Sequence, residues 1–122
     1  VIAGDFNTMG CLECRPKIRA PAELLELTAA LAALEVPFRR VESAPACSEY
    51  YRGEGGLLDH FVVTRGMREV PPETRAHVEG YCAEVSCARL PEHRMPRAYE
   101  ELSDHCPTVL ELTDRDLDPA ER

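Results

Sequence analysis

No run of apolar residues in this sequence approaches the length of about 20 that a membrane-spanning helix requires. A charged-then-apolar leader, an internal repeat and a low-complexity segment are also missing from it. Because the sequence opens on Val1 and its first residues are already typical of a strand, we expect the natural amino terminus to lie upstream. The 122 residues, 44% hydrophobic and 30% charged, predict one globular domain with a core of modest size.

Basic residues are in the minority: 14 Lys and Arg against 22 Asp and Glu give a formal net charge of −8. High-affinity, non-specific nucleic-acid binders are normally basic, so this surface as a whole is not expected to attract polyanions. Part of the acidic excess lies near the end of the chain, in Asp114, Asp116, Asp118 and Glu121. We therefore divide the chain into a domain at 1–113 and an acidic, frayed tail at 114–122.

Six cysteines are many for a chain of this length. Two residues separate Cys11 from Cys14 and four separate Cys82 from Cys87, and such pairs can be zinc ligands, short disulfides or chance. For Cys82 and Cys87 a disulfide is slightly favoured, because no glycine that could form a zinc knuckle lies between them.

The remaining two cysteines, Cys47 and Cys106, are expected to pack as small apolar residues. Disulfides would favour an exported protein, whose location the sequence otherwise leaves unknown.

One helix is expected at 21–35. Pro21 suits a first helical position, leucines at 24, 27, 31 and 34 repeat on one face that we assign to the core, and Pro37 ends the helix. We expect strands at 1–4 (buried), 38–41, 47–51, 57–64 and 108–113, with a glycine turn at 53–56 and a long connection at 66–102.

Three short motifs place polar side chains at the ends of these strands or inside them. They are Gly4-Asp5-Phe6-Asn7, Leu57-Leu58-Asp59-His60-Phe61 and Ser103-Asp104-His105-Cys106-Pro107. Asp59 and His60 are adjacent in a strand, so their side chains point to opposite faces. An ionised Asp59 inside a strand needs a partner, and an imidazole from a neighbouring strand end is a natural one.

Each motif also has a plainer interpretation. Asp5 and Asn7 can form a turn that caps itself, and Ser103 with Asp104 can do the same. His60 is expected to be a packed, hydrogen-bonded histidine without chemistry, and His77 and His93 are expected to be solvated.

Taken together, the three motifs resemble the endonuclease/exonuclease/phosphatase superfamily of metal-dependent phosphohydrolases in residues, order and approximate spacing. The resemblance covers 1–112 and corresponds to the second half of that family's domain. It implies an α/β (α+β) fold, the carboxy-terminal half of a four-layer α/β/β/α sandwich, with a mostly antiparallel or mixed sheet and a flanking helix. The missing amino-terminal half of the same domain would supply an Asn and a Glu at the metal, so the fragment is expected to be inactive alone.

The resemblance also implies a role for each motif residue. Asp104 would be a ligand of Mg²⁺ or Mn²⁺, and His105, held by Asp59, would contact the substrate phosphate or act in acid–base chemistry. Asp5 would orient or deprotonate the attacking water, and Asn7 would donate a hydrogen bond to a phosphate oxygen. Which group is the general base stays open.

The implied substrate is a phosphodiester in a nucleic acid, a phospholipid head group or a small molecule. The negative charge of the chain favours the last two over long DNA. The alternative function is a non-catalytic binding or regulatory domain whose loops are stapled by cysteines.

Overall fold

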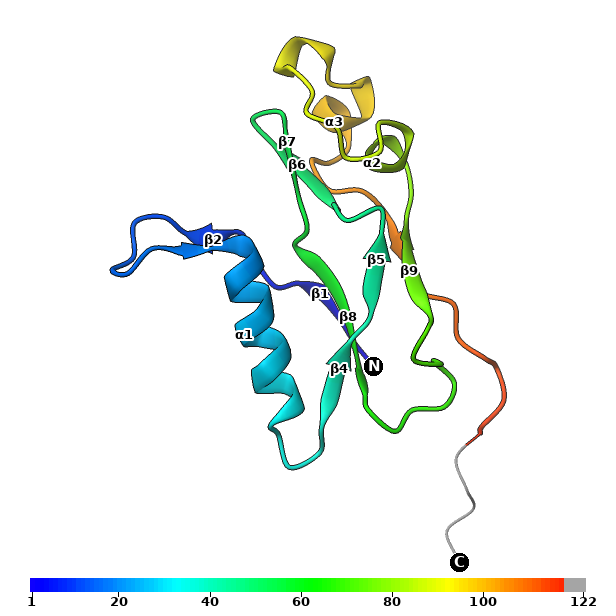
Figure 1. Cartoon of the computed structure of the whole chain (residues 1–122). Helices are drawn as coiled ribbons and strands as arrows, with labels where there is room; N and C mark the ends of the chain where they lie inside the picture. Colours follow the sequence, from blue (N-terminus) through cyan, green and yellow to red (C-terminus); the bar gives the residue numbers. More distant parts are fainter. Residues whose placement is uncertain (118–122) are drawn as a thin grey trace, which may run out of the picture.

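The chain folds into a mixture of helices and strands, with antiparallel and mixed sheets, which confirms the predicted α+β class (Figure 1). A computed structural model describes residues 1–117. In chain order the elements are β1 (Ile2–Asp5), β2 (Gly10–Cys11), β3 (Ile18–Arg19), α1 (Ala20–Ala32), β4 (Phe38–Arg40), β5 (Glu42–Ala44), β6 (Glu49–Tyr51), β7 (Glu54–Gly56), β8 (Asp59–Thr64), β9 (Arg75–Val78), α2 (Tyr81–Glu84), the 3₁₀ helix η1 (Glu92–Arg94), α3 (Arg97–Glu101) and β10 (Thr108–Val109).

Two three-stranded sheets form the body of the molecule. In the first, β8 lies between β1 and β4 and runs antiparallel to both. In the second, β9 lies between β10, which is antiparallel to it, and β5, which is parallel. β5 contacts β8, so the two sheets meet along these strands, and α1 packs beside β4 (Figure 1).

Two short hairpins extend from the sheets. The β2–β3 hairpin precedes α1, and the β6–β7 hairpin turns through Arg52 and Gly53, whose φ angles are 51° and 82°. Positive φ at both turn positions matches the right-handed twist of the flanking strands. A side chain at Gly53 would collide with the carbonyl oxygen of Leu90, so this position requires glycine.

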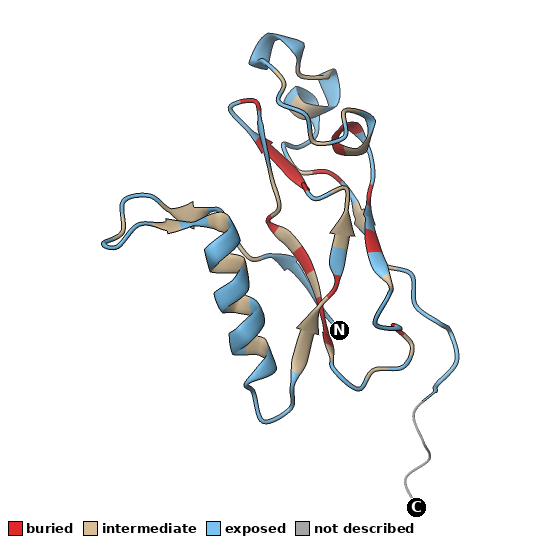
Figure 2. Ribbon diagram, viewed as in Figure 1, coloured by how far each residue is buried: buried red, intermediate tan, exposed pale blue. Residues whose placement is uncertain are grey.

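Buried residues gather in two clusters, seen as red segments of the ribbon in Figure 2. One cluster lies between β6, α2 and the segment before β10, and contains Cys47, Tyr50, Val78, Tyr81, Cys82 and Cys106. The other lies where the sheets meet and contains Val41, Val63, Val70 and Ala76. No helix within residues 1–117 is long and apolar enough to cross a bilayer.

The prediction of a buried first strand was wrong. β1 covers Ile2–Asp5, and all four of its residues are exposed. The physical reason is its position: β1 is an edge strand that pairs only with β8, and no other described element covers it.

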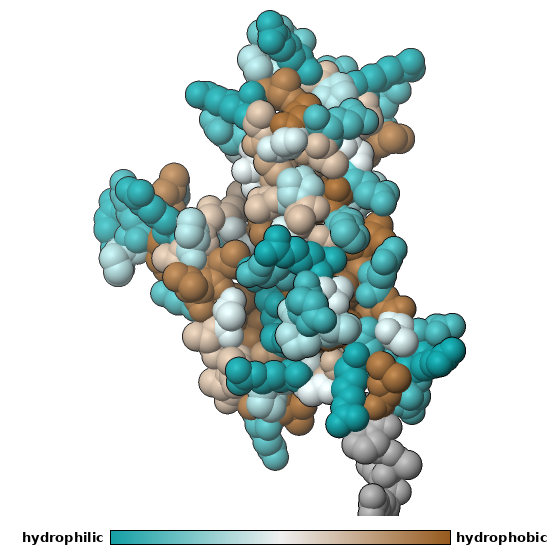
Figure 3. Space-filling model, turned by 45° about the vertical axis from the view of Figure 1, so that its right-hand side comes forward, coloured by the Kyte–Doolittle hydropathy of each residue, from teal (hydrophilic) through white to brown (hydrophobic). Residues whose placement is uncertain are grey.

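The helix predicted at 21–35 is present but shorter, since α1 covers Ala20–Ala32 with a proline in its first turn. The assignment of its leucine face to the core was too strong. Leu24, Leu27 and Leu31 are only half-buried and Leu34 is 51% exposed, because α1 contacts one edge of a sheet. Figure 3 shows hydrophobic side chains reaching the surface on this side of the molecule.

The other predicted strands are recovered as shorter ones, β4, β6, β8 and β10. The segment 66–102, expected to be a long connection, instead contains β9, α2, η1 and α3. Repeated prolines obscured these elements, each of which is only three to five residues long.

The disulfide favoured between Cys82 and Cys87 was wrong. Cys11 and Cys14 form a disulfide, but Cys82 bonds Cys106 and Cys87 bonds Cys47. Cys82 lies on α2 and its amide faces the sulfur of Cys106, whereas Cys87 follows the end of that helix with a φ of 58°. Cys47 and Cys106 are buried as expected, but as bonded partners and not as free thiols.

The acidic tail was expected to be frayed from 114 onward. That expectation stays a prediction; at the end of the described part, the Leu117 N–H donates to a carboxylate oxygen of Glu69 at 2.8 Å. That bond lowers the pKa of Glu69. Asp118 and Glu121, the other acids assigned to the tail, lie outside the described residues.

Candidate functional site

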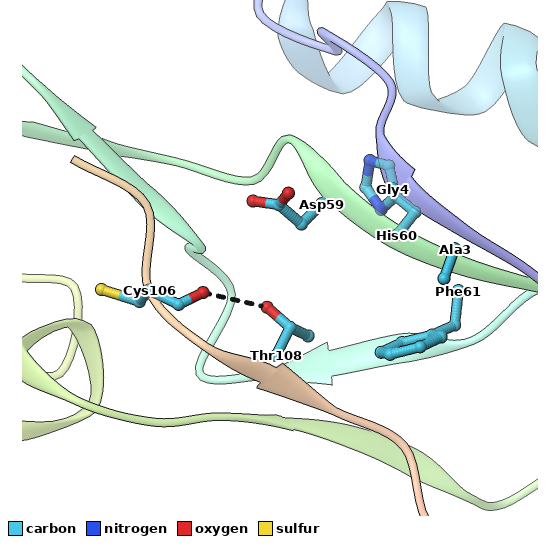
Figure 4. Close-up of a pocket in the computed structure, with 7 residues that line it drawn as sticks. All are labelled: Ala3, Gly4, Asp59, His60, Phe61, Cys106 and Thr108. Carbon is cyan, nitrogen blue, oxygen red and sulfur yellow. Dashed lines mark hydrogen bonds between the residues drawn. The ribbon is translucent and has the colours of Figure 1, made fainter. Parts of the chain in front are cut away.

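The candidate site begins at Asp59, the first residue of β8. The backbone N–H groups of Leu58 and Asp59 both donate to the side-chain oxygen of Ser48, at 3.1 and 2.9 Å. Ser48 is fully buried, so its hydroxyl fixes the start of β8 from inside the protein. The Asp59 side chain then points away from its neighbour His60, as expected for adjacent residues of a strand (Figure 4).

His105 reaches the same place from the loop that precedes β10. Its backbone N–H donates to the Ser103 hydroxyl at 3.0 Å, which is the turn that the plainer interpretation of this motif predicts. His105 also pairs with Glu49 in an isolated antiparallel bridge, and the next N–H, that of Cys106, donates to the Ser48 carbonyl oxygen at 2.7 Å. The Ser48–Glu49 backbone therefore holds His105 while the Ser48 side chain holds Asp59.

The two side chains meet as an Asp–His dyad, with Nδ1 of His105 2.8 Å from Oδ2 of Asp59. A carboxylate only accepts hydrogen bonds, so Nδ1 of His105 carries the proton. The other ring nitrogen, Nε2, remains able to bind a second group. The side chains are 33% and 23% exposed, which leaves the dyad accessible from solvent. The predicted pairing of Asp59 with His105 is thus confirmed, while a catalytic role for either residue stays a prediction.

Opposing effects set the pKa of His105. Burial is the largest single effect and lowers the pKa. The hydrogen bond to Asp59 and the charges of Asp59, Asp104 and Asp5 raise it, and their sum exceeds the effect of burial. The net result is a pKa above the ordinary histidine value, so the imidazolium form persists to higher pH than in a free histidine.

Asp5 lies directly opposite Asp59 in the register of β1 and β8. Side chains of directly opposite residues lie on the same face of a sheet, so Asp5 shares the face of the dyad. Its carboxylate also accepts the backbone N–H of Asn7 at 2.7 Å, which is the predicted self-capping turn. Asn7 has a φ of 52° and an exposed side chain, and this backbone bond links it to Asp5.

Asp104 contributes to the site through its charge and its backbone. Its carbonyl oxygen accepts the N–H of Tyr50 at 2.9 Å and the hydroxyl of Tyr81 at 2.7 Å. The side chain is exposed, and its charge raises the pKa values of His105, Glu49 and Tyr81. The segment is therefore anchored by two tyrosines while its carboxylate faces outward.

The acidic groups do not form a metal centre by themselves. Within residues 1–117, no three side chains of Asp, Glu, His or Cys converge closely enough to hold an ion. Asp104 offers one hard oxygen ligand, but Mg²⁺ and Mn²⁺ take about six ligands, of which several are commonly water. The described residues thus do not fit a complete Mg²⁺ or Mn²⁺ site.

His60 is the packed histidine that the sequence predicts. It is 1% exposed, and its Nε2 lies 2.8 Å from the Thr8 hydroxyl, which itself donates to the Leu57 carbonyl oxygen. Because that hydroxyl has only one proton to donate, the proton between it and His60 belongs to Nε2. Burial, then the charge of Arg40, lowers the pKa of His60 to about 4, so the ring is neutral at physiological pH.

A cavity of about 260 Å³ lies between the first sheet and the segment that carries Cys106 (Figure 4). Asp59 and Phe61 line it from β8, and Cys106 and Thr108 line it from the opposite side. The cavity places open space against the carboxylate that holds His105.

Sequence reasoning missed two residues of this site, Ser48 and Glu49. Glu49 is 6% exposed, and burial raises the pKa of its carboxyl, an effect increased by Asp104, Asp59 and Asp5 and opposed by His105. Its carboxylate lies against Gly56, where any side chain would collide with it. The available signal was a charged residue between Cys47 and Tyr50 in a short apolar strand, since a buried charge needs a partner.

The assembled site can offer one hydrogen-bond donor from a fixed imidazole, among carboxylates that act as acceptors. A protonated His105 presents an N–H from Nε2, Asp59 fixes the ring, and Asp5 offers a hydrogen-bond acceptor on the same face. No protein-family model matches the chain, and no curated protein and no solved structure is similar enough to it to assign a relative.

Proposed function

We propose that this chain carries the phosphate-binding and proton-transfer part of a divalent-metal-dependent phosphohydrolase acting on phosphodiesters. The observation that carries the proposal is the Asp59–His105 dyad, with its 2.8 Å hydrogen bond and the raised pKa of His105. The proposal agrees with the resemblance of the three motifs to the endonuclease/exonuclease/phosphatase superfamily.

His105 binds the phosphoryl group in this proposal. The imidazolium donates from Nε2 to a phosphoryl oxygen, which places a positive charge where negative charge increases during hydrolysis. Asp59 keeps the proton on Nδ1 and prevents rotation of the ring. A fixed donor needs no reorientation when the substrate reacts, so the dyad lowers the barrier more than a free histidine would.

Asp5 orients the attacking water and accepts its proton in this proposal. Its carboxylate lies opposite Asp59 and is already oriented by the N–H of Asn7. A water that donates a proton to Asp5 would be directed toward the phosphorus of a group bound at His105. Asn7 would add an amide hydrogen bond to a phosphate oxygen after its exposed side chain turns toward the substrate.

Asp104 would supply one ligand to Mg²⁺ or Mn²⁺, the ion expected to neutralise charge on the phosphate. Because the described residues assemble no three-ligand group, Asp104 would hold the ion only together with ligands that these residues do not provide. In the same proposal the two three-stranded sheets are inner layers of a four-layer α/β/β/α sandwich, with α1 as part of an outer layer.

A non-catalytic binding domain is the second candidate. The observation that favours it is that two disulfides, Cys47–Cys87 and Cys82–Cys106, connect the segments on both sides of the dyad. Three disulfides also support the proposal that the protein matures in an oxidising compartment and is exported.

The experiment is an assay of the complete gene product with bis(p-nitrophenyl) phosphate in the presence of Mg²⁺ or Mn²⁺. We expect hydrolysis that stops with a chelator and falls by about 100-fold or more in His105→Ala, the usual range for losing an acid–base group. His93→Ala, which removes an exposed histidine of η1, is the matched control and should keep full activity. Full activity of His105→Ala would exclude the mechanism, and inactivity of the unmodified protein with every divalent ion tested would favour the binding domain.

A further inference from the structure

A second cavity, of about 400 Å³, is lined by His105 and is built mainly by α2, α3 and the segment between α3 and β10. These elements belong to the stretch 66–107, which follows the two strands that carry Asp5 and Asp59. Because His105 lines the cavity, a substrate whose phosphate lies against this histidine would extend one of its ester groups into it.

The lining of this cavity is apolar in character. Pro96, Ala98, Leu102 and Pro107 contribute carbon surface, and Leu102 is 84% exposed. Apolar surface of this kind gains free energy when a ligand removes it from water. The cavity therefore favours a hydrophobic occupant.

Tyr81 contributes its aromatic ring to the cavity lining, and its hydroxyl is already hydrogen-bonded within the protein. Its hydroxyl already donates to the Asp104 carbonyl oxygen at 2.7 Å and lies 3.2 Å from that of Ser103. Burial, then the charge of Asp104, raises the pKa of Tyr81 to about 12, so the phenol stays neutral. The ring packs edge-on against Tyr99 of α3 with centroids 6.2 Å apart, which holds α2 and α3 together around the cavity.

The charge of the cavity lining favours an apolar ester group over a polyanion as the ligand. The lining contains no Lys or Arg, and its one carboxylate is that of Glu84. A nucleic-acid strand would bring a second phosphate within one nucleotide of the first, and nothing in this lining would neutralise it. An uncharged ester group meets no such penalty.

We propose that this cavity binds an uncharged, apolar ester group of a phosphodiester whose phosphate lies against His105. The inference rests on the proposed function and adds the substrate class. The preferred substrates are small phosphodiesters with an aromatic or alkyl ester group, and nucleic-acid strands are poor ones.

The test is a binding measurement on the chain itself with two esters of equal charge, diphenyl phosphate and dimethyl phosphate. NMR shifts of the His105 ring and of the Ala98 and Leu102 methyl groups report phosphate and ester contacts separately. We expect diphenyl phosphate to bind at least about 10-fold more tightly, because only its rings bury apolar surface in the cavity.

Two variants locate the effect. Ala98→Trp fills the cavity from an exposed position of α3 and should reduce the affinity for diphenyl phosphate to that for dimethyl phosphate. Leu102→Ser should weaken diphenyl phosphate alone, by several-fold. Leu25→Ser, which changes another exposed leucine (72%), on α1, should leave both affinities unchanged.

The outcomes separate this inference from the proposed function. Equal affinity for the two esters, with clear shifts of His105, would overturn the apolar ester site and leave the phosphate site intact. A single-stranded oligonucleotide that displaces diphenyl phosphate at equal concentration would also overturn it. Failure of both esters to shift His105 would contradict the phosphate site and, with it, both proposals.

Discussion

Nδ1 of His105 lies 2.8 Å from Oδ2 of Asp59, although 46 positions separate the two residues in the chain. The contact joins the first sheet to the loop before the second, and Ser48 holds both sides of it. Three separate stretches of chain must therefore be in place before the dyad exists. The electrostatics of His105 consequently report on the folded site as a whole.

Replacing Asp59 by Asn should lower the pKa of His105. The change removes the hydrogen-bonded charge that raises this pKa and leaves burial, which lowers it. The measurement is a proton NMR titration of the imidazole. Asp114→Asn, the same charge change in the exposed tail, is the control and should leave the titration unchanged. An unaltered midpoint in Asp59→Asn would show that the dyad does not form in solution.

The same variant gives a pH dependence of stability with a definite sign. A histidine whose pKa is raised by folding stabilises the protein fully below its unfolded value of about 6.5, and this contribution disappears as the pH rises through the folded pKa. The difference in unfolding free energy between wild type and Asp59→Asn should thus be largest near pH 6 and shrink in alkaline solution. Since His105 is one-third exposed, we expect at most about 1 kcal/mol from urea denaturation.

Replacing Ser48 by Ala should destabilise the protein by about 1–3 kcal/mol, because one buried and one partly buried N–H group lose their acceptor. A positioning role adds a second readout: the pKa of His105 should fall as Asp59 loses its fixed place. Thr28→Ala removes an exposed hydroxyl that donates to a helix carbonyl and should cost less than about 0.5 kcal/mol. Destabilisation of Ser48→Ala without any change in the His105 titration would limit Ser48 to a structural role.

The dyad could be predicted from sequence because it follows from a local rule. A carboxylate in the apolar strand 57–64 needs a partner, and a histidine just before another strand provides one. For Glu49 this rule says only that a partner is needed, and the uncharged Ser48 does not fall under it. Their contacts depend on how the β6–β7 hairpin lies against both β8 and the loop before β10, and that arrangement is set by long-range packing.

The cysteine pairs and the first strand also depended on long-range packing, which the local sequence does not predict. Spacing suggested a bond between Cys82 and Cys87, yet α2 directs Cys82 toward Cys106. Apolar, β-branched residues at 1–4 suggested burial, yet an edge strand is covered only if another element lies beside it. In each case the local pattern identified the element, and its neighbours determined the outcome.

Acid should destabilise the protein partly through His60. Its pKa of about 4 lies below the unfolded value of about 6.5. As the pH falls between these values, the unfolded chain binds a proton at this histidine and the folded chain does not, so the unfolded state is favoured. His60→Gln keeps a neutral donor toward Thr8 but cannot titrate. Relative to this variant, the wild type should lose up to about 3 kcal/mol between pH 7.5 and pH 4 in urea denaturation. His77→Gln, which makes the same change at an exposed position of β9, is the matched control. A flat difference for His60→Gln would contradict the neutral buried ring.

Removing the Cys82–Cys106 disulfide should damage both the fold and the site. The bond spans a separation of 24 residues, and the loss of its restraint on the unfolded chain costs about 3–4 kcal/mol in the chain-entropy model. The Cys11–Cys14 bond spans three residues, so its removal should cost about 2 kcal/mol or less. Paired serine variants measured by urea denaturation give both values.

The titration of His105 distinguishes a local from a general effect of the two bonds. Cys106 is adjacent to His105, so its release should shift the imidazole pKa. Cys11 ends β2 and Cys14 lies in the loop of the β2–β3 hairpin, so their release should not affect it. Free-thiol counting on the unfolded, unreduced wild type should find no thiol, since all six cysteines are bonded. Six thiols, or an unchanged His105 titration after release of Cys106, would contradict a disulfide that supports the dyad.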